Sequence, residues 1–298
     1  MSTYSIAISG LVFTTFIWGI TFELVEESLK SIPPSIFSAI RFSIAASCTL
    51  LLIVFKYKKI KIENSDIKAG IICAILLSMG YFFQSFGLWE NIFYLKSDPN
   101  KSAFITGTSV LMVPLIFFFM GQGKPSVHLL FSITLVLAGL GILLNPNVEN
   151  FTFGDVLTFG CAISFAVHII FQGKYLINQI KNIYNFFFIQ MIFTALFFVI
   201  GGIIEWQYLN YRIDWNYTVI SGLWITGVLA TFVAILIMVW AQKIVSPIQT
   251  AMIFTLEPVF AGFYNHYFTD HILSSWGVFS GFIIVLGILY HEYKVNKL

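Results

Sequence analysis

Charged side chains are scarce in this chain: aspartate, glutamate, lysine and arginine together make up 10% of its 298 residues. A soluble globular domain usually carries about 25% charged residues. Hydrophobic residues instead account for 58% of the chain, and the mean hydropathy is +0.87. The composition therefore excludes an ordinary soluble domain and predicts an all-α integral membrane protein with the lipid bilayer as its partner.

Cysteine is also rare, and its three copies, Cys48, Cys73 and Cys161, fall within apolar stretches without metal-ligand spacing. An odd number of cysteines placed in this way excludes a disulfide framework and a zinc site. The five histidines show no paired ligand spacing either, so we predict no metal, no cofactor and no enzymatic activity. The net charge is only +2, and we predict no nucleic-acid partner.

Most of the sequence consists of long runs of apolar residues. A helix needs about 20 apolar residues to cross the roughly 30 Å hydrocarbon core of a bilayer. The first run lacks a basic segment and a cleavage site, so we expect it to be retained as a span rather than removed as a signal peptide. The sequence predicts ten transmembrane helices, at residues 5–23, 34–55, 67–89, 102–121, 126–144, 153–173, 184–204, 218–239, 246–268 and 273–291.

The chain repeats itself after about half its length. The pattern Ser102-x₃-Thr106-x₇-Pro114 recurs as Ser246-x₃-Thr250-x₇-Pro258, and Leu-Gly-Ile-Leu occurs at 140–143 and at 286–289. Self-similarity at a fixed period indicates an internal duplication. We therefore expect two five-helix repeats, residues 1–148 and 149–298, that act as one unit. Because five is odd, the second repeat enters the membrane in the opposite direction, which makes an inverted repeat.

The distribution of basic residues predicts the orientation. With the N-terminus inside, the outer loops keep only Lys30, Lys96, Lys101 and Arg212. Inner loops of membrane proteins carry an excess of lysine and arginine, so we predict that both termini are cytoplasmic. The inner segments would then hold Lys56, Lys58, Lys59, Lys61, Lys68, Lys124, Lys174, Lys181, Lys243, Lys294 and Lys297.

Short motifs run through both halves of the chain. The first half has Trp18-Gly19-x₂-Phe22, Arg41-Phe42, Gln84-x₂-Gly87-Leu88 and Ala103-Phe104-Ile105-Thr106-Gly107 with Pro114. The second half has Gly154-Asp155, Gln190, Ala241-Gln242-x₃-Ser246-Pro247 and Leu256-Glu257-Pro258-Val259-Phe260-Ala261. In these motifs the chain resembles the EamA family of the drug/metabolite transporter superfamily. The resemblance implies a carrier of small metabolites in the bacterial inner membrane that works by alternating access and often exports its substrate.

Two charged residues stand well inside predicted spans, away from the span ends: Arg41 and Glu257. A charge at the membrane centre costs roughly 2.5 to 3.5 kcal/mol, so it normally faces a cavity or a partner. Pro258 removes a backbone donor next to Glu257, and Pro114 holds the matching position in the fourth span, so we expect both helices to be interrupted at equivalent depths. Glu257 either binds a substrate ammonium group, carries a proton, or serves as a structural carboxylate that caps freed amides or pairs with Arg41. For Arg41 we favour a structural or gating ion pair over substrate binding.

Aromatic and amide side chains supply a second set of candidates. Family-like positions that could line a cavity are Trp18, Phe22, Tyr81, Gln84, Gln190 and Gln242. His168 and Gln172 share one face of the sixth span, and a structural role is the favoured interpretation of this histidine.

The predicted activity is transport of a small molecule by a secondary transporter. We favour export of an amino acid or amine, because Glu257, Glu23 and Glu26 offer anionic partners for an ammonium group. The alternatives are a broad exporter of hydrophobic or aromatic compounds and a non-transport receptor or assembly protein. Proton coupling also stays open. A homodimer formed through the glycines of the fifth and tenth spans is also an open alternative. The favoured role of these glycines is packing within one subunit; they are Gly139, Gly141, Gly281 and Gly287.

Overall fold

The computed structural model describes residues 2–57, 62–89, 96–122, 124–146, 151–209, 212–268 and 274–295. The predicted boundary between the two repeats, at residues 148 and 149, lies outside these ranges, as do Lys58, Lys59, Lys61 and Lys297. The described residues fold into helices and contain no strand. The helices are α1 (Thr3–Leu29), α2 (Pro34–Tyr57), α3 (Asn64–Leu88), α4 (Pro99–Gly107), α5 (Ser109–Phe119), α6 (Val127–Leu144), α7 (Phe153–Asn178), α8 (Ile183–Leu209), α9 (Tyr217–Ile225), the π-helix η1 (Thr226–Val233), α10 (Ala234–Ala241), α11 (Pro247–Phe254), α12 (Glu257–Phe268) and α13 (Ser275–Val295).

Nine segments of the described chain are long and apolar enough to cross a membrane, and each overlaps a predicted span. Two of them join several elements: residues 100–119 combine α4 and α5, and residues 217–241 combine α9, η1 and α10. The predicted span at 246–268 differs, because α11 and α12 divide it and each alone is too short to cross. The chain is thus an all-helical membrane protein.

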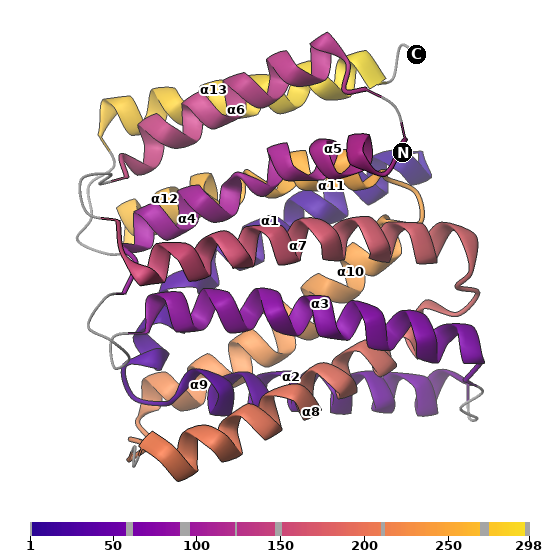
Figure 1. Ribbon diagram of the computed structural model, residues 1–298, viewed down its shortest axis with the longest axis vertical. Coiled ribbons are helices and arrows are strands. Elements are labelled where there is room, and N and C mark those ends of the chain that lie inside the picture. Colours follow the sequence, from indigo (N-terminus) through magenta and orange to yellow (C-terminus); the bar gives the residue numbers. More distant parts are fainter. Residues whose placement is uncertain are drawn as a thin grey trace.

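The helices lie side by side and run between two ends of the molecule (Figure 1). α6 packs on α13 along one edge, and α2 packs on α8 along the opposite edge, while α3 and α7 lie together between them. We call the end that contains Thr3 and Val295 the terminal end, since both chain termini lie there (Figure 1). The opposite end, which contains Leu29 and Leu88, is the far end.

Three spans are interrupted. The ninth breaks at Thr255 and Leu256, directly before Glu257 and Pro258, as expected where a proline removes a backbone donor. The fourth breaks at Thr108 and not at Pro114, which lies inside α5, so the prediction that Pro114 marks the interruption is wrong. At this break the Thr108 hydroxyl donates to the carbonyl of Ile105 at 2.5 Å.

The third interruption is the π-helix η1 in the eighth span, which the sequence analysis missed. Its eight residues, from Thr226 to Val233, are apolar apart from two threonines, and no proline marks the position. A π-helical turn inside an α-helix often occurs at a functional site.

Glycines allow α6 and α13 to approach closely within one subunit. A Cβ atom at Gly139 would lie 2.6 Å from Ile284 Cγ1 and 3.0 Å from the carbonyl oxygen of Ser280. A Cβ atom at Gly287 would lie 3.0 Å from the carbonyl oxygen of Ser132. Both glycines therefore serve packing between these two helices.

We expect Gly139→Ala to lower the thermal stability of the protein in detergent, because backbone atoms of α13 would have to move. Overpacking of this kind typically costs about 1–3 kcal/mol. Gly141→Ala is the matched control, since its Cβ atom would meet only Phe104 at 3.7 Å and alanine is the better helix former. Equal melting temperatures for the two variants would contradict the packing role of Gly139.

Candidate functional site

A cavity of about 580 Å³ lies among α1, α2, α3, α4, α7, α10, α11 and α12. This volume suits a small organic molecule. The cavity extends from His168 and Phe254 in the interior to Glu26, Asp98 and Asn265 near the helix ends of the far end. Its mouth is therefore at the far end.

The structure brings most of the predicted site residues together around this cavity. Those that line it are Glu257, Trp18, Phe22, Tyr81, Gln84, Glu23, Arg41, Pro258 and His168. Gln190 and Gln242 are absent from the described lining and are buried in the bundle, each with 0% of its surface exposed. Pro114 borders a separate pocket of about 310 Å³ beside Lys124 and Ser246.

Glu257 stands at the first residue of α12, immediately after the break in the ninth span. Gly19 lets α1 approach the start of α12 closely, because a Cβ atom at position 19 would lie 2.8 Å from the carbonyl oxygen of Glu257. Within the described chain the Glu257 carboxylate makes no hydrogen bond and no ion pair. A carboxylate in the membrane interior is costly unless it is compensated, so its oxygens are available to a ligand in the cavity.

Arg41 is held by other partners. Its Nε donates to Thr231 Oγ1 at 2.6 Å and its Nη2 donates to the Tyr81 hydroxyl at 3.4 Å. The guanidinium carbon lies 4.9 Å from the centre of the Tyr81 ring, a cation–π distance. The direct Arg41–Glu257 pair that the sequence left open is not formed among the described residues. Arg41 therefore fixes α2 against η1 and α3.

The π-helix also holds the aromatic wall of the cavity. Trp18 Nε1 donates to the carbonyl of Ala230 in η1 at 2.8 Å, and the Trp18 ring meets Phe254 edge to face at 4.9 Å. Tyr81 makes similar edge contacts with Phe165 at 5.4 Å. These contacts give the cavity rigid aromatic surfaces beside Glu257.

The described lining of the cavity is rich in carboxyl groups. Arg41 is the only cationic side chain among its described lining residues. One carboxylate oxygen of Glu23, Oε2, is buried without a hydrogen-bond partner. The acidic residues of the lining are Glu23, Glu26, Glu27, Asp98 and Glu257. Such a surface raises the local concentration of cations and repels anions.

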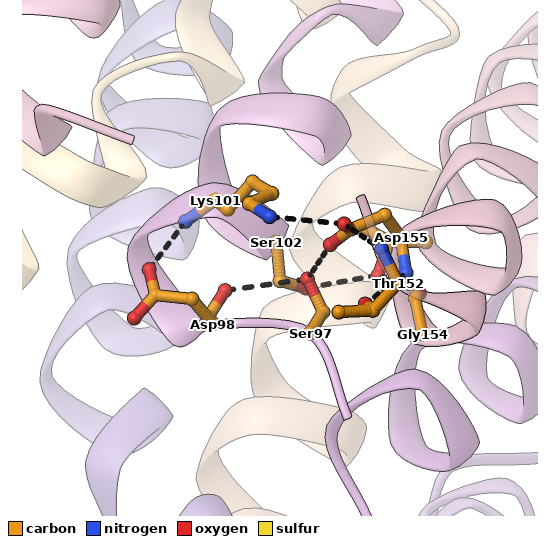
Figure 2. Close-up of polar contacts among 8 residues, drawn as sticks. Ser97, Asp98, Lys101, Ser102, Thr152, Gly154 and Asp155 are labelled. Atoms are coloured by element: carbon orange, nitrogen blue, oxygen red, sulfur yellow. Dashed lines mark hydrogen bonds and ion pairs between the residues drawn. The ribbon is translucent and has the colours of Figure 1, made fainter. Parts of the chain in front are cut away.

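A buried ion pair supports the far end of the cavity (Figure 2). Lys101 Nζ lies 3.0 Å from Asp155 Oδ2, and the Ser97 hydroxyl donates to Asp155 Oδ1 at 2.5 Å. The backbone N–H of Thr152 donates to the same carboxylate at 2.8 Å, so this carboxylate is fully hydrogen-bonded. The pair ties the start of α4 to the start of α7.

Sequence reasoning missed this pair, because Lys101 was predicted in an outer loop and Asp155 only as part of a motif. A signal was present, since Thr152 and Asp155 have the spacing of a capping box. The glycines of two family-like motifs meet beside the pair. A Cβ atom at Gly87 would lie 2.9 Å from the carbonyl oxygen of Gly154, so only glycine permits this crossing of α3 and α7.

Polar and close packing contacts join several helices at the terminal end of the bundle. Tyr4 Oη donates to Glu292 Oε2 at 2.6 Å, and Gln249 Nε2 donates to Glu292 Oε1 at 3.0 Å, which joins α1, α11 and α13. Gly173 of α7 packs on Pro247, since its Cβ atom would lie 2.8 Å from the proline ring. These contacts pack α1, α7, α11 and α13 together at the terminal end, whereas the described lining of the cavity reaches the far end.

We expect Lys101→Met to destabilise the protein by about 3 kcal/mol, because it leaves the buried Asp155 carboxylate without its cation. The double variant Lys101→Met/Asp155→Asn should recover much of this loss. Thermal unfolding in detergent measures both. The control is Lys30→Met in the Lys30–Glu27 pair, whose side chains are 56% and 47% exposed and whose loss should cost little. A Lys101 variant as stable as this control would contradict the role of the pair.

The chain is similar to two proteins named as transporters, and to a solved structure, over nearly its whole length. A protein of Archaeoglobus fulgidus named "Uncharacterized transporter" is 29% identical over 286 residues, which cover 96% of this chain and 85% of that protein. "Uncharacterized transporter YoaV" of Bacillus subtilis is 22% identical over 293 residues, or 97% of both chains. A solved crystal structure superposes with a TM-score of 0.77 over 98% of both chains, and at 16% identity this shows a shared fold.

The model of the EamA-like transporter family matches the chain twice, at residues 5–145 and 152–291. The two matches together cover most of the chain, and they follow the internal duplication. The chain, a multi-pass membrane protein, therefore belongs to the EamA-like transporter family.

Proposed function

We propose that this protein is a secondary transporter that exports small amines or amino acids across the bacterial inner membrane. The observation that carries the proposal is Glu257, an intramembrane carboxylate that faces the cavity and makes no hydrogen bond or ion-pair contact in the described chain. An ammonium group would supply the missing charge and up to three hydrogen-bond donors. The candidate substrate-binding residues are Glu257, Glu23, Gln84 and the aromatic side chains beside them.

The remaining lining fits the same ligand class. Trp18, Phe22 and Tyr81 offer ring faces that attract a cation and pack against its apolar part. The carboxylates of Glu26 and Asp98 near the mouth would attract cations toward Glu257. A nucleotide sugar or phosphate ester fits poorly, because Arg41 is the only cation in the described lining and is already bonded.

We further propose that residues 1–148 and 149–298 are inverted five-helix repeats of one transport unit. Two polar clusters at opposite ends support this arrangement. At the terminal end, Tyr4 and Gln249 link the starts of α1 and α11. At the far end, Asp155 and Lys101 link the starts of α7 and α4. Each cluster joins the first span of one repeat to the fourth span of the other, as inversion requires.

The proposed orientation places both termini in the cytoplasm. Lysines gather where helices finish or resume at the terminal end, namely Lys56, Lys68, Lys124, Lys174, Lys181, Lys243 and Lys294. Such an excess is typical of the cytoplasmic side. The far end, and with it the mouth of the cavity, would then face outward.

Export of neutral hydrophobic or aromatic compounds is the second candidate. The aromatic wall formed by Trp18, Phe254 and Tyr81 favours it, because stacking needs no charge. The two candidates differ in whether transport depends on a carboxylate, so one exchange experiment separates them.

We expect Glu257→Gln to reduce exchange of a labelled amine or amino acid by about a hundredfold or more while expression and melting temperature stay unchanged. Losing a buried ion pair with a ligand is typically worth about 3 kcal/mol or more, and each 1.4 kcal/mol is about tenfold. The measurement is exchange in proteoliposomes preloaded with a mixture of amines and amino acids, repeated at several pH values. A change of rate with pH would indicate proton coupling.

The control is Asp214→Asn, which removes an exposed carboxylate outside the described lining of the cavity and should leave exchange nearly unchanged. Normal exchange by Glu257→Gln would refute the assigned role of this residue. Uptake of a neutral aromatic compound that is insensitive to Glu257→Gln would move the assignment to the second candidate.

A further inference from the structure

A row of buried polar side chains continues from the inner limit of the cavity toward the terminal end. It consists of His168 and Gln172 on α7, Gln190 on α8 and Gln242 directly after α10, and we call it the amide seam. His168 is 2% exposed, and the three glutamines are 0% exposed. Only His168 belongs to the described lining of the cavity.

The hydrogen bonds of the amide seam leave Gln172 with an unused acceptor. The carbonyl of Ile169 accepts a hydrogen bond from Gln242 at 3.2 Å, so the atom that donates must be Gln242 Nε2. Gln242 Oε1 then accepts from Gln172 Nε2 at 2.6 Å. This chain of bonds fixes both amides, and Gln172 Oε1 remains buried without a donor among the described residues.

Gln190 also has an amide oxygen without a hydrogen-bond donor among the described residues. Its Nε2 lies 2.8 Å from His168 Nε2, and its Oε1 is buried without a partner. Buried acceptors in folded proteins are almost always satisfied, so two unpaired amide oxygens in one seam need an explanation. His168 and Gln172 are one turn apart on one face of α7, which places the two amides at neighbouring depths.

The duplication relates the amide seam to the open cavity. The two family matches begin at residues 5 and 152, so equivalent positions at the start of each half are 147 residues apart. His168 then corresponds to Thr21 and Gln172 to Val25. Both Thr21 and Val25 line the cavity that opens at the far end. In an inverted repeat, the matching face of α7 would line a cavity open at the terminal end.

We propose that the amide seam is the closed second half of the substrate path. When the bundle opens at the terminal end, Gln172 Oε1 and Gln190 Oε1 accept hydrogen bonds from the ammonium group that Glu257 binds in the present conformation. The seam thus forms a second, uncharged subsite for the same cation. This inference rests on the proposed function and adds residues that lie outside the present cavity.

Cysteine accessibility tests the proposal without knowledge of the natural substrate. Gln172→Cys and Gln190→Cys are made in a background with Cys48→Ala, Cys73→Ala and Cys161→Ala, and each is reconstituted in sealed proteoliposomes of known orientation. The probe is the membrane-impermeant cation 2-(trimethylammonium)ethyl methanethiosulfonate, added on the side of the terminal end. We expect both variants to be labelled from this side, although their positions are fully buried in the present conformation.

A subsite for cations should also favour a cationic reagent. We expect labelling by this reagent to exceed labelling by the anionic 2-sulfonatoethyl analogue by at least about tenfold, after correction for their rates with a free thiol. Val136→Cys and Ile284→Cys are matched controls, because both positions are 0% exposed but lie between α6 and α13. These two should stay unlabelled. Gln242→Cys replaces either test variant that fails to keep its melting temperature.

Absence of labelling at two folded seam positions would overturn the inference, as would labelling equal to that of the controls. The proposed function has its own readout in the same vesicles. Glu257-dependent exchange with an unlabelled seam would support the proposed transport function and contradict the second subsite. Labelling of the seam by the cationic reagent, without exchange of any amine or amino acid, would support the second half of the path and contradict the proposed substrate class.

Discussion

The hydrocarbon core of a bilayer offers no water to an unpaired backbone N–H or C=O group, and this constraint governs the structure. A span can depart from the α-helix only where side chains, other helices or a cavity receive the freed groups. The interruptions obey this rule. Thr108 and Thr255 each bond a backbone carbonyl three residues earlier, and η1 offers the carbonyl of Ala230 to Trp18. All three departures therefore lie at or next to the cavity wall.

The same constraint sorts the buried carboxylates into two kinds. Asp155 and Glu205 are buried and fully engaged: Asp155 bonds Lys101, Ser97 and Thr152, and Glu205 accepts from the backbone N–H of Ser35. These carboxylates hold helix ends together. Glu257 has no such engagement in the described chain and faces a cavity. Carboxylates with hydrogen-bond partners thus build the frame, whereas Glu257, and Glu23 with its unpartnered Oε2, are left for a ligand.

Much of this arrangement could be predicted from the chain itself. The span limits follow from runs of apolar residues, and the break before Glu257 follows from Pro258. The prediction failed at Pro114, because a threonine six residues earlier ends the helix first. It also gave no sign of η1, since a π-helical turn depends on packing against α1 and α2 rather than on a local residue pattern. Gln190 and Gln242 matched a family pattern, yet their side chains lie in the amide seam and not in the open cavity.

The sequence by itself determined the membrane class, the positions of most spans, the duplication and the acidic residue beside a helix break. These features depend on hydropathy, repeats and backbone chemistry over consecutive residues. Only the tertiary structure decided that Arg41 bonds Thr231, that Lys101 pairs with Asp155, and that the cavity opens at the far end. The first two contacts join residues 190 and 54 positions apart. Their formation depends on how helices pack, which no local pattern specifies.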